Sequence, residues 1–283
     1  MILRKKRLFL VLILVICILV ASISLVTLKM SHTFTIDSRQ VAIETLPEDF
    51  IGFKIGFFSD LDIKDSKDIQ YIDKCVNQIN SQNCDLIIFG GDLFEDGHIF
   101  DEESLITILK SIKAPYGKFA ILGENEFKNE LEKSIILLEK CGFQVLRNQA
   151  TPIYYKNSQL CLAGLESNGN IDQILTDEQK NQTVIAAIHQ PDYFNELSNQ
   201  SINIQLSGHT GGGFIRLPFF GAIQKIDGGQ TFYYNTYSQN GKSLYISNGI
   251  GLGHNQSFRL FTNPNALVLT LSKRQETLSS SEA

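Results

Sequence analysis

Carboxylate and imidazole side chains recur at five points along this chain, each beside glycine or another turn-forming residue. These segments read Ser-Asp-Leu-Asp at 59–62, Gly-Asp at 91–92, Gly-Glu-Asn-Glu at 123–126, His-Gln-Pro-Asp at 189–192 and Ser-Gly-His at 207–209. Carboxylates and imidazoles together form a ligand set that suits Mn, Fe or Zn. Neighbouring glycines let the backbone turn sharply and approach a ligand closely. The combination predicts a metal site.

Each segment follows a short apolar run that reads as a buried strand. The runs are residues 54–58, 85–89, 118–122, 183–188 and 202–206. In an open α/β sheet, the carboxyl ends of the strands form the crevice where ligands bind. A single Asp after a strand is usually a turn residue, and a lone His is more often structural than a ligand. Five such segments in order favour one shared site.

Helical patterns separate the earlier strands, whereas the second half of the chain is mostly strands. Residues 66–80 carry apolar side chains at helical spacing, and 103–112 and 129–141 are similar, the last closed by Gly142. Further strands are expected at 152–155, 159–164, 231–237, 243–247 and 266–271. This order predicts an α/β sandwich with two central sheets flanked by helices.

The five segments and their flanks resemble the calcineurin-like metallophosphoesterases, in particular the membrane-anchored or exported bacterial branch. That family's pattern is Asp-x-His, Gly-Asp, Gly-Asn-His-Asp/Glu, a lone His, and Gly-His-x-His. The flanks at 189–194, 212–218 and 247–251 are similar as well, and the resemblance covers roughly residues 50–272. It implies a four-layer α/β/β/α sandwich and a centre of two divalent metal ions that activates hydroxide to attack phosphorus.

Four residues match ligand positions of the family, namely Asp60, Asp92, His189 and His209. The resemblance implies that Asp92 bridges the two metals and is essential to catalysis. One metal would then be held by Asp92, His189 and His209.

Four other positions depart from the family pattern. Asp62 stands for a ligand His and Glu124 for a ligand Asn, and both can still offer an oxygen to a metal. Gly211 stands for the last ligand His and has only backbone atoms to offer. Asn125 replaces the His that assists the transition state; it can orient a phosphate but cannot transfer a proton at neutral pH.

These four departures affect the two implied metal positions unequally. Glu124 joins the position that keeps both imidazoles. The other is left with oxygens alone, from Asp60, Asp62 and Asp92, a set that favours Mn or Mg over Fe or Zn. We therefore expect two divalent ions from the family pattern, or one if the oxygen-only position stays empty. His98 and His254 could replace the lost imidazoles, but exposed loop histidines are the simpler interpretation.

The N-terminal region predicts a membrane anchor. Residues 8–28 are uncharged and rich in Leu, Ile and Val, a length that spans a bilayer core of about 30 Å as a helix. The alternative is a cleaved signal peptide, whose apolar region is usually shorter. Basic residues at 4–7 place the N-terminus in the cytoplasm and the domain outside the cell membrane. We expect a basic tail at 1–7, the anchor at 8–28, a linker at 29–48, the phosphoesterase domain at 49–272 and a disordered tail at 273–283.

Charge and cysteine content narrow the function further. Residues 1–29 hold five of the 25 basic residues and none of the 30 acidic ones, so the remainder, with 20 bases against 30 acids, carries about −10. A domain this acidic is a poor candidate for nucleic-acid binding. Cys75, Cys84, Cys141 and Cys161 lie in apolar segments, and we interpret them as core residues, not disulfides.

Two functions remain open. The first is a metal-dependent phosphoesterase that hydrolyses a phosphomonoester, a phosphodiester or a lipid pyrophosphate outside the cytoplasm. The second is a catalytically impaired pseudoenzyme that serves as a membrane-tethered binding or scaffold module. The losses at Asn125 and Gly211 motivate the second, whereas the oxygen-bearing replacements Asp62 and Glu124 favour the first.

Overall fold

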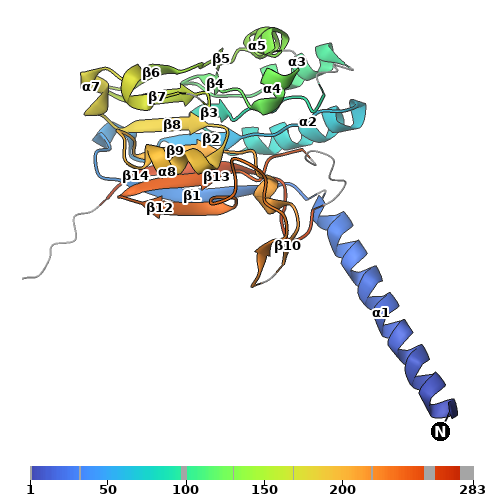
Figure 1. Cartoon of the computed structure of the whole chain (residues 1–283). Coiled ribbons are helices and arrows are strands. Elements are labelled where there is room, and N and C mark those ends of the chain that lie inside the picture. The colour runs from blue at the N-terminus through green and yellow to red at the C-terminus, as the bar shows by residue number, and fades with distance from the viewer. Residues whose placement is uncertain are drawn as a thin grey trace, which may run out of the picture.

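Two six-stranded mixed sheets form the centre of the body in the computed structural model, which describes residues 2–31, 33–96, 101–129, 131–167, 169–217, 219–251 and 259–274 (Figure 1). The strands of the first sheet, in spatial order, are β1 (Thr35–Ile43), β14 (Asn265–Lys273), β2 (Lys54–Phe58), β3 (Leu86–Phe89), β4 (Lys118–Ala120) and β5 (Gln144–Val145). Those of the second are β12 (Asn235–Gln239), β13 (Lys242–Ile246), β9 (Ile204–Ser207), β8 (Val184–Ile188), β7 (Ser158–Leu165) and β6 (Gln149–Tyr155). A separate hairpin pairs β10 (Arg216–Leu217) with β11 (Gly221–Ala222).

Parallel pairing brings the carboxyl ends of several strands to the same edge of each sheet. β2, β3, β4 and β5 run parallel in the first sheet. β7, β8, β9 and β13 run parallel in the second. Both sets therefore supply the edge at which the sequence predicts the metal site.

Helices cover the outer faces of the sheets and complete the layers. Beside the first sheet lie α2 (Ser66–Asn80), α3 (Glu102–Lys110), α4 (Glu124–Lys128) and α5 (Leu131–Lys140). The shorter helices are α6 (Ile171–Ile174), α7 (Asp177–Lys180), α8 (Phe194–Leu197), η1 (Glu48–Phe50), η2 (Pro191–Tyr193) and η3 (Gly211–Gly213). These helices and the two mixed sheets confirm the α/β layered part of the prediction.

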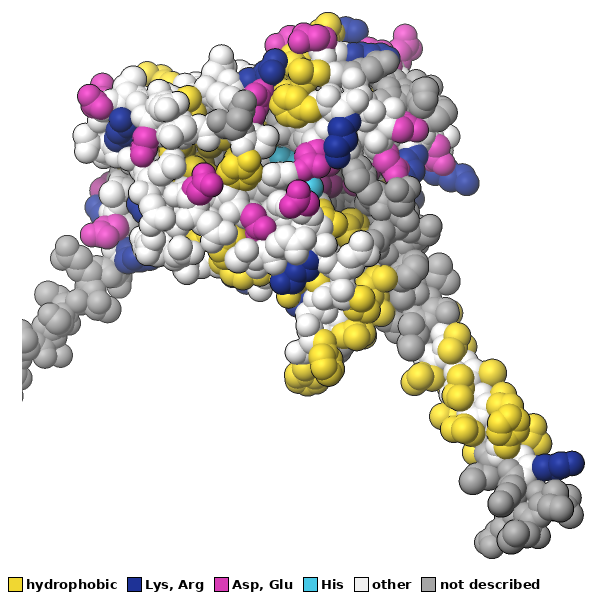
Figure 2. Space-filling view, viewed as in Figure 1, with side chains coloured by type: hydrophobic (Ala, Val, Ile, Leu, Met, Phe, Trp, Pro, Cys, Tyr) yellow, Lys and Arg dark blue, Asp and Glu magenta, His cyan; other side chains and the backbone are white. Residues whose placement is uncertain are grey.

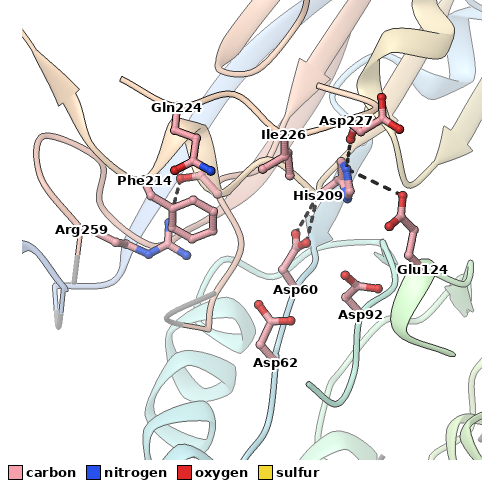
Figure 3. A pocket seen from close by; sticks show the side chains of 11 residues that line it. Asp60, Asp62, Asp92, Glu124, His209, Phe214, Gln224, Ile226, Asp227 and Arg259 are labelled. Carbon is pink, nitrogen blue, oxygen red and sulfur yellow. Dashed lines mark hydrogen bonds and ion pairs between the residues drawn. The ribbon is translucent and has the colours of Figure 1, made fainter. Parts of the chain in front are cut away.

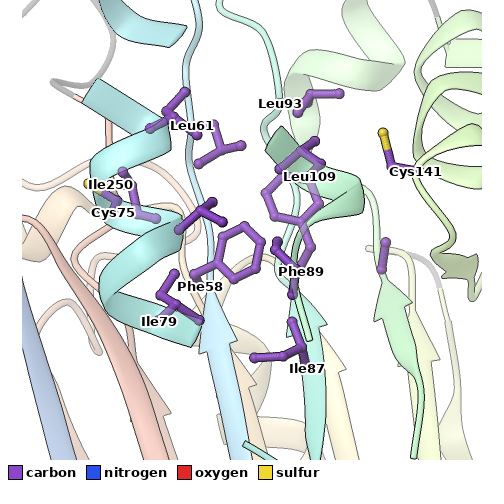
Figure 4. Close-up of a cluster of buried hydrophobic side chains, with 14 of the residues drawn as sticks. Phe58, Leu61, Cys75, Ile79, Ile87, Phe89, Leu93, Leu109, Cys141 and Ile250 are labelled. Carbon is purple, nitrogen blue, oxygen red and sulfur yellow. The ribbon is translucent and has the colours of Figure 1, made fainter. Parts of the chain in front are cut away.

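Three apolar clusters hold the layers together. Strand β2 shows how: Ile55 and Phe57 point into the cluster between the sheets, while Phe58 points into the cluster beneath α2 and α3. Figure 4 shows this outer cluster, in which Phe58 and Phe89 pack with ring centres 5.3 Å apart. The third cluster lies between the second sheet and α6 and α8, and includes Phe194.

The predicted helix at 66–80 coincides with α2, because both its apolar spacing and its N-cap are strong. Asp65 accepts hydrogen bonds from the backbone N–H groups of Lys67 and Asp68, and the Asp68 carboxylate accepts from the Asp65 N–H, which completes a capping box. The strand expected at 231–237 is shifted, since β12 begins at Asn235.

Residues 35–43, interpreted from the sequence as linker, form strand β1. This strand pairs with β14 along its whole length. Val41 and Ile43 are buried, whereas Ser38, Arg39 and Gln40 are exposed. An edge strand whose middle is solvated has a polar sequence there, and this explains the incorrect interpretation.

The predicted anchor lies in helix α1 (Ile2–Ser31), which projects away from the body (Figure 1). Its side chains are described without a break only over residues 9–22, and within the described part of the chain no helix is both apolar and long enough to cross a membrane. The transmembrane helix stays a prediction from the sequence.

The interpretation of the four body cysteines is confirmed. Cys75, Cys84, Cys141 and Cys161 are buried free thiols. Burial raises their pKa, to about 12 for Cys75 and about 11 for the others. His98, His254 and most of the predicted tail lie outside the described residues.

Candidate metal centre

The five polar segments meet at the carboxyl edges of the two sheets, where backbone hydrogen bonds join them. The Asp60 N–H donates to the Gly91 carbonyl oxygen at 2.9 Å and the Gly208 N–H to that of His189 at 3.0 Å. The Asp60 carboxylate accepts from the His209 N–H at 2.9 Å, which links the first sheet to the second. The sequence prediction that these segments converge is therefore correct.

Four of the converging residues have left-handed backbone conformations although none is glycine. The φ angles are 52° at Asp60, 45° at Asp62, 60° at Asp92 and 71° at His209. Such conformations cost on the order of 1–3 kcal/mol each and concentrate at functional sites. Each of the four follows the end of a strand, and Figure 3 shows their side chains around one cavity.

His189 is oriented as a metal ligand. Its Nδ1 lies 2.7 Å from the Gly90 carbonyl oxygen, which can only accept, so Nδ1 carries the proton. Although burial lowers it, the charges of Asp92 and Asp60 raise the pKa of His189 well above its ordinary value, so in the metal-free protein the buried Nε2 carries a proton as well. Nε2 lies 3.2 Å from Asp92 Oδ2 and 3.8 Å from Asp60 Oδ1. A carbonyl that fixes the imidazole in this way is typical of metal-binding histidines.

His209 is fixed through its other ring nitrogen. Its Nε2 lies 2.6 Å from the Asp227 carbonyl oxygen, so Nε2 carries the proton and Nδ1 the lone pair of the neutral ring. Burial and the neighbouring His189 lower the pKa of His209, which favours this neutral form. The two imidazole rings meet edge to face, with centres 5.1 Å apart.

Asp92, His189 and His209 each offer one ligand atom, and these atoms all lie within 4.8 Å of one another. Beside them lies a cavity of about 460 Å³. Its lining comprises Asp60, Asp62, Asp92, Glu124, His209, Gly211, Phe214, Gln224, Ile226, Asp227 and Arg259 (Figure 3). The trio is the part of the predicted ligand set that the structure gathers most closely.

The electrostatics around the trio suit a cation. Burial, with the charges of Asp60 and Asp92, raises the pKa of Asp62 well above its ordinary value. Burial also raises the pKa of Asp60, against the lowering effect of His189. At Asp92, His189 and the Asn125 N–H outweigh burial and hold the pKa at about 2. Three buried carboxylates repel one another, and a divalent ion between them relieves that repulsion, so these residues fit the implied metal.

Glu124 and Asn125 begin helix α4, beside the acidic residues. Glu124 is half-exposed and accepts from Gln190 Nε2 and, at 3.0 Å, from Lys128 Nζ. Its Oε1 is 3.9 Å from His209 Nε2. Asn125 is buried, and its Nδ2 donates to Asp62 Oδ1 at 3.4 Å.

The position of the missing imidazole is filled by an aromatic ring. A side chain at Gly211 would begin 2.2 Å from the ring of Phe214. The guanidinium of Arg259, which is fully buried, lies 5.2 Å from the centre of that ring. It donates to the Gly211 and Asn248 carbonyl oxygens at 3.1 and 2.8 Å. Arg259 thus places a positive charge on the wall of the cavity that the acidic residues share.

Neither Phe214 nor Arg259 was recognised as a site residue from the sequence. Phe214 belongs to the flank at 212–218, which carries no charged or metal-binding pattern at that position, and no motif surrounds Arg259. Glu126 was also missed. It is buried and accepts from the N–H groups of Asp92, Leu93 and Gly123, which fixes the loops that carry the ligands.

A model of the calcineurin-like phosphoesterase family matches residues 53–212, more than half of the chain. The chain belongs to this family. The match contains all five segments that build the centre, and it identifies the protein as a phosphoesterase of the hydrolase class.

Individual proteins similar to this chain are also named as metallophosphoesterases or phosphatases. The chain is 28% identical to the uncharacterized metallophosphoesterase YkuE of Bacillus subtilis over 249 residues, 85% of this chain and 86% of that one. It is 30% identical to an uncharacterized metallophosphoesterase of Aquifex aeolicus over 200 residues, 66% of this chain and 72% of that one. Among solved structures, a dimetal phosphatase from Danio rerio aligns with a TM-score of 0.44 and 11% identity, over 70% of this chain and 88% of that one.

Proposed function

We propose that this phosphoesterase uses a divalent metal at Asp92, His189 and His209 to hydrolyse a phosphate ester outside the cytoplasm. The observation that carries the proposal is the buried His189 Nε2, which lies 3.2 Å from Asp92 Oδ2 and 3.8 Å from Asp60 Oδ1 while the Gly90 carbonyl oxygen holds Nδ1. A cation bound between these buried groups would replace the Nε2 proton and offset the repulsion among the carboxylates.

The chemistry divides between the metal and the protein. A divalent ion held by the trio would supply Lewis-acid stabilisation of the phosphate and lower the pKa of attacking water. Asp92, His189 and His209 would hold that ion, with the Gly90 carbonyl oxygen orienting His189 and the Asp227 carbonyl oxygen orienting His209. Asn125 can orient a phosphate oxygen through Nδ2 but cannot itself protonate the leaving group.

The substrate and location are part of this proposal. The uncharged run at 8–28, with basic residues before it, supports a cell-membrane anchor whose N-terminus is cytoplasmic. A domain tethered there meets phosphomonoesters, phosphodiesters and lipid pyrophosphates. One relative, from Escherichia coli, is named phosphodiesterase YaeI and is 25% identical over 228 residues.

A second candidate is the membrane-tethered pseudoenzyme. The Phe214 ring, which fills the space beside Gly211, favours it, because this ring leaves no room for the second imidazole. A single metal without turnover would then serve only to stabilise a binding module.

The deciding experiment measures metal content and activity of the purified full chain together. After reconstitution with Mn, the protein is assayed on p-nitrophenyl phosphate and on its bis ester. We expect bound metal with turnover, and we expect Asp92→Ala to lose both. Asp177→Ala, which removes an exposed carboxylate from α7, is the matched control and should keep both. Metal without turnover in the unaltered protein would support the pseudoenzyme, and an Asp92→Ala variant with full metal content and activity would rule out this centre.

A further inference from the structure

The β10–β11 hairpin exposes large apolar side chains that the body of the protein does not cover. Phe219 and Phe220 are 105% and 85% exposed, the highest values for large hydrophobic side chains among the described residues. Leu217 and Ile223 beside them are 40% and 64% exposed. Figure 2 shows these side chains as an apolar projection that extends from the body to the same side as α1. Contiguous exposed apolar surface of this kind marks a binding surface.

The backbone at the tip is strained in a way that keeps the aromatic side chains outside. Phe219 has a φ of 70°, a left-handed conformation that is a clear outlier for a bulky residue. This strained conformation displays a phenylalanine in water, where burial would be favourable. A partner that covers the tip removes this penalty.

The charges around the hairpin indicate which partner fits. Residues 197–226 contain no acidic residue, and their only bases are Arg216 and Lys225, although the chain as a whole has a net charge of −5. Arg216 lies over the ring of Tyr234 at 3.5 Å and Lys225 over that of Tyr233 at 4.6 Å. Phenylalanines at a tip, with tyrosines and bases at its root, match the order of layers in a bilayer interface with anionic headgroups.

The hairpin also leads directly to the metal centre. Gln224, Ile226 and Asp227, which follow β11, line the same cavity as the acidic residues. Figure 3 shows Ile226 and Asp227 beside His209. A hairpin held in lipid would therefore place one wall of the cavity at the membrane surface.

We infer that the β10–β11 hairpin inserts Phe219 and Phe220 into the interfacial region of an anionic bilayer. The cavity beside the metal centre then opens toward phosphate esters carried by lipids. The choice of a lipid-linked substrate depends on the proposed function, whereas the insertion itself does not. A second copy of the chain is the other occupant that an apolar tip could accept, and the experiment below separates the two.

The chain contains no tryptophan, so one substitution creates a unique reporter. Phe219→Trp is made in the full chain and reconstituted into vesicles of phosphatidylcholine and phosphatidylglycerol in equal parts. We expect a blue shift of its emission, quenching by lipids brominated on the acyl chain, and loss of quenching by aqueous acrylamide. The matched control is Tyr154→Trp, an aromatic side chain on β6 that is 67% exposed and should remain quenched by acrylamide alone.

Other outcomes overturn the inference. Acrylamide quenching of Phe219→Trp equal to that of Tyr154→Trp in vesicles would show a tip that remains in water. A blue shift without quenching by brominated lipids, together with a dimer in solution, would assign the tip to a second copy. Equal insertion into pure phosphatidylcholine would overturn the role given to Arg216 and Lys225.

A second pair of measurements links insertion to the substrate. Phe219→Ser/Phe220→Ser should keep the rate on p-nitrophenyl phosphate and lose most of the rate on a phosphate ester of a lipid in the same vesicles. An equal loss on both substrates would contradict the link to lipid substrates. If the unaltered protein hydrolyses neither ester while Phe219→Trp is quenched by lipid, the proposed function fails and insertion stands.

Discussion

At the residue scale, Gly211 and Phe214 behave as one unit. The ring of Phe214 occupies the space that a side chain at 211 would need, and Arg259 lies against the same ring. At this position, the Phe214 ring and the positive charge of Arg259 take the place of the imidazole that the family pattern has there. Restoring a histidine requires room as well as the residue itself.

This pairing predicts different results for the single and double variants. Gly211→His should lower the free energy of unfolding by about 1–3 kcal/mol, because overpacking forces the ring or the backbone to shift. It should add no metal. Gly211→His/Phe214→Ala should recover part of that loss and bind one more equivalent of Mn than the unaltered protein. Elemental analysis and urea denaturation test both points. A Gly211→His single variant that is fully stable and binds additional metal would contradict this account.

Glu126 makes the stability of the metal-free protein depend on pH. Burial and the charge of Asp92 raise the pKa of Glu126 from 4.5 to about 7. Between these two pKa values the folded state holds a proton that the unfolded state releases. The contribution of Glu126 to the free energy of unfolding is therefore fully present below the unfolded pKa of 4.5 and is lost as the pH rises through the folded pKa of about 7. Glu126→Gln should remove one proton from this dependence, at most about 1.4 kcal/mol per pH unit.

The same substitution has a second, pH-independent effect. An amide can replace only part of the three hydrogen bonds that the carboxylate accepts, so Glu126→Gln should lower stability by about 1–3 kcal/mol throughout. Urea denaturation of the chelated protein at about pH 5 and about pH 7 separates the two effects. Glu103→Gln, on the exposed side of α3, should leave the pH dependence unchanged. A Glu126→Gln variant with an unaltered pH dependence would refute the explanation.

Much of the candidate site could be predicted from the sequence, because its residues follow strand ends. Asp60, Asp92, His189 and His209 were each located by a short local pattern, and the structure brings them together. Phe214 and Arg259 carried no such pattern. Their role arises only from contacts between segments far apart along the chain, which local spacing does not encode.

At the scale of elements, strand β1 is the clearest difference between expectation and structure. Its sequence is polar at the centre, and only Val41 and Ile43 show the alternation of a half-buried strand. Pairing with β14 supplies the hydrogen bonds that make this segment a strand, and no residue pattern within the segment predicts that pairing. By contrast, α2 was predicted over its full length because its apolar spacing and its cap lie within the helix itself.

Two neighbouring substitutions test β1. Val41→Asp should lower the free energy of unfolding by about 3 kcal/mol or more, because it buries a charge between the sheets. Ala42→Asp, one residue along and on the exposed face, should change it by no more than about 0.5 kcal/mol. Thermal denaturation of both variants is sufficient. Equal effects at the two positions would mean that the segment is a linker after all.

At the scale of the whole molecule, the two sheets share the central apolar cluster, so they should unfold together. Three buried thiols lie in the outer cluster of the first sheet and Cys161 lies in that of the second. Their accessibility therefore reports on each half separately. Both halves should open at the same urea concentration, because neither sheet can lose the central cluster alone.

A thiol-reactive dye measures this cooperativity directly. The four buried thiols should react as a single group across the urea transition. Mass spectrometry of labelled peptides assigns each site. Reaction of Cys161 at a lower urea concentration than Cys75 would show that the halves unfold independently.

The left-handed aspartates have an evolutionary consequence. Asp62 combines backbone strain with burial beside two other carboxylates, and exchanging it for glycine would relieve both. Asp60 and Asp92 differ, because each accepts a backbone hydrogen bond that holds the site together. In a lineage that had stopped using its metal, loss of Asp62 would therefore meet little resistance from stability. The presence of Asp62 favours a centre in current use over a relic.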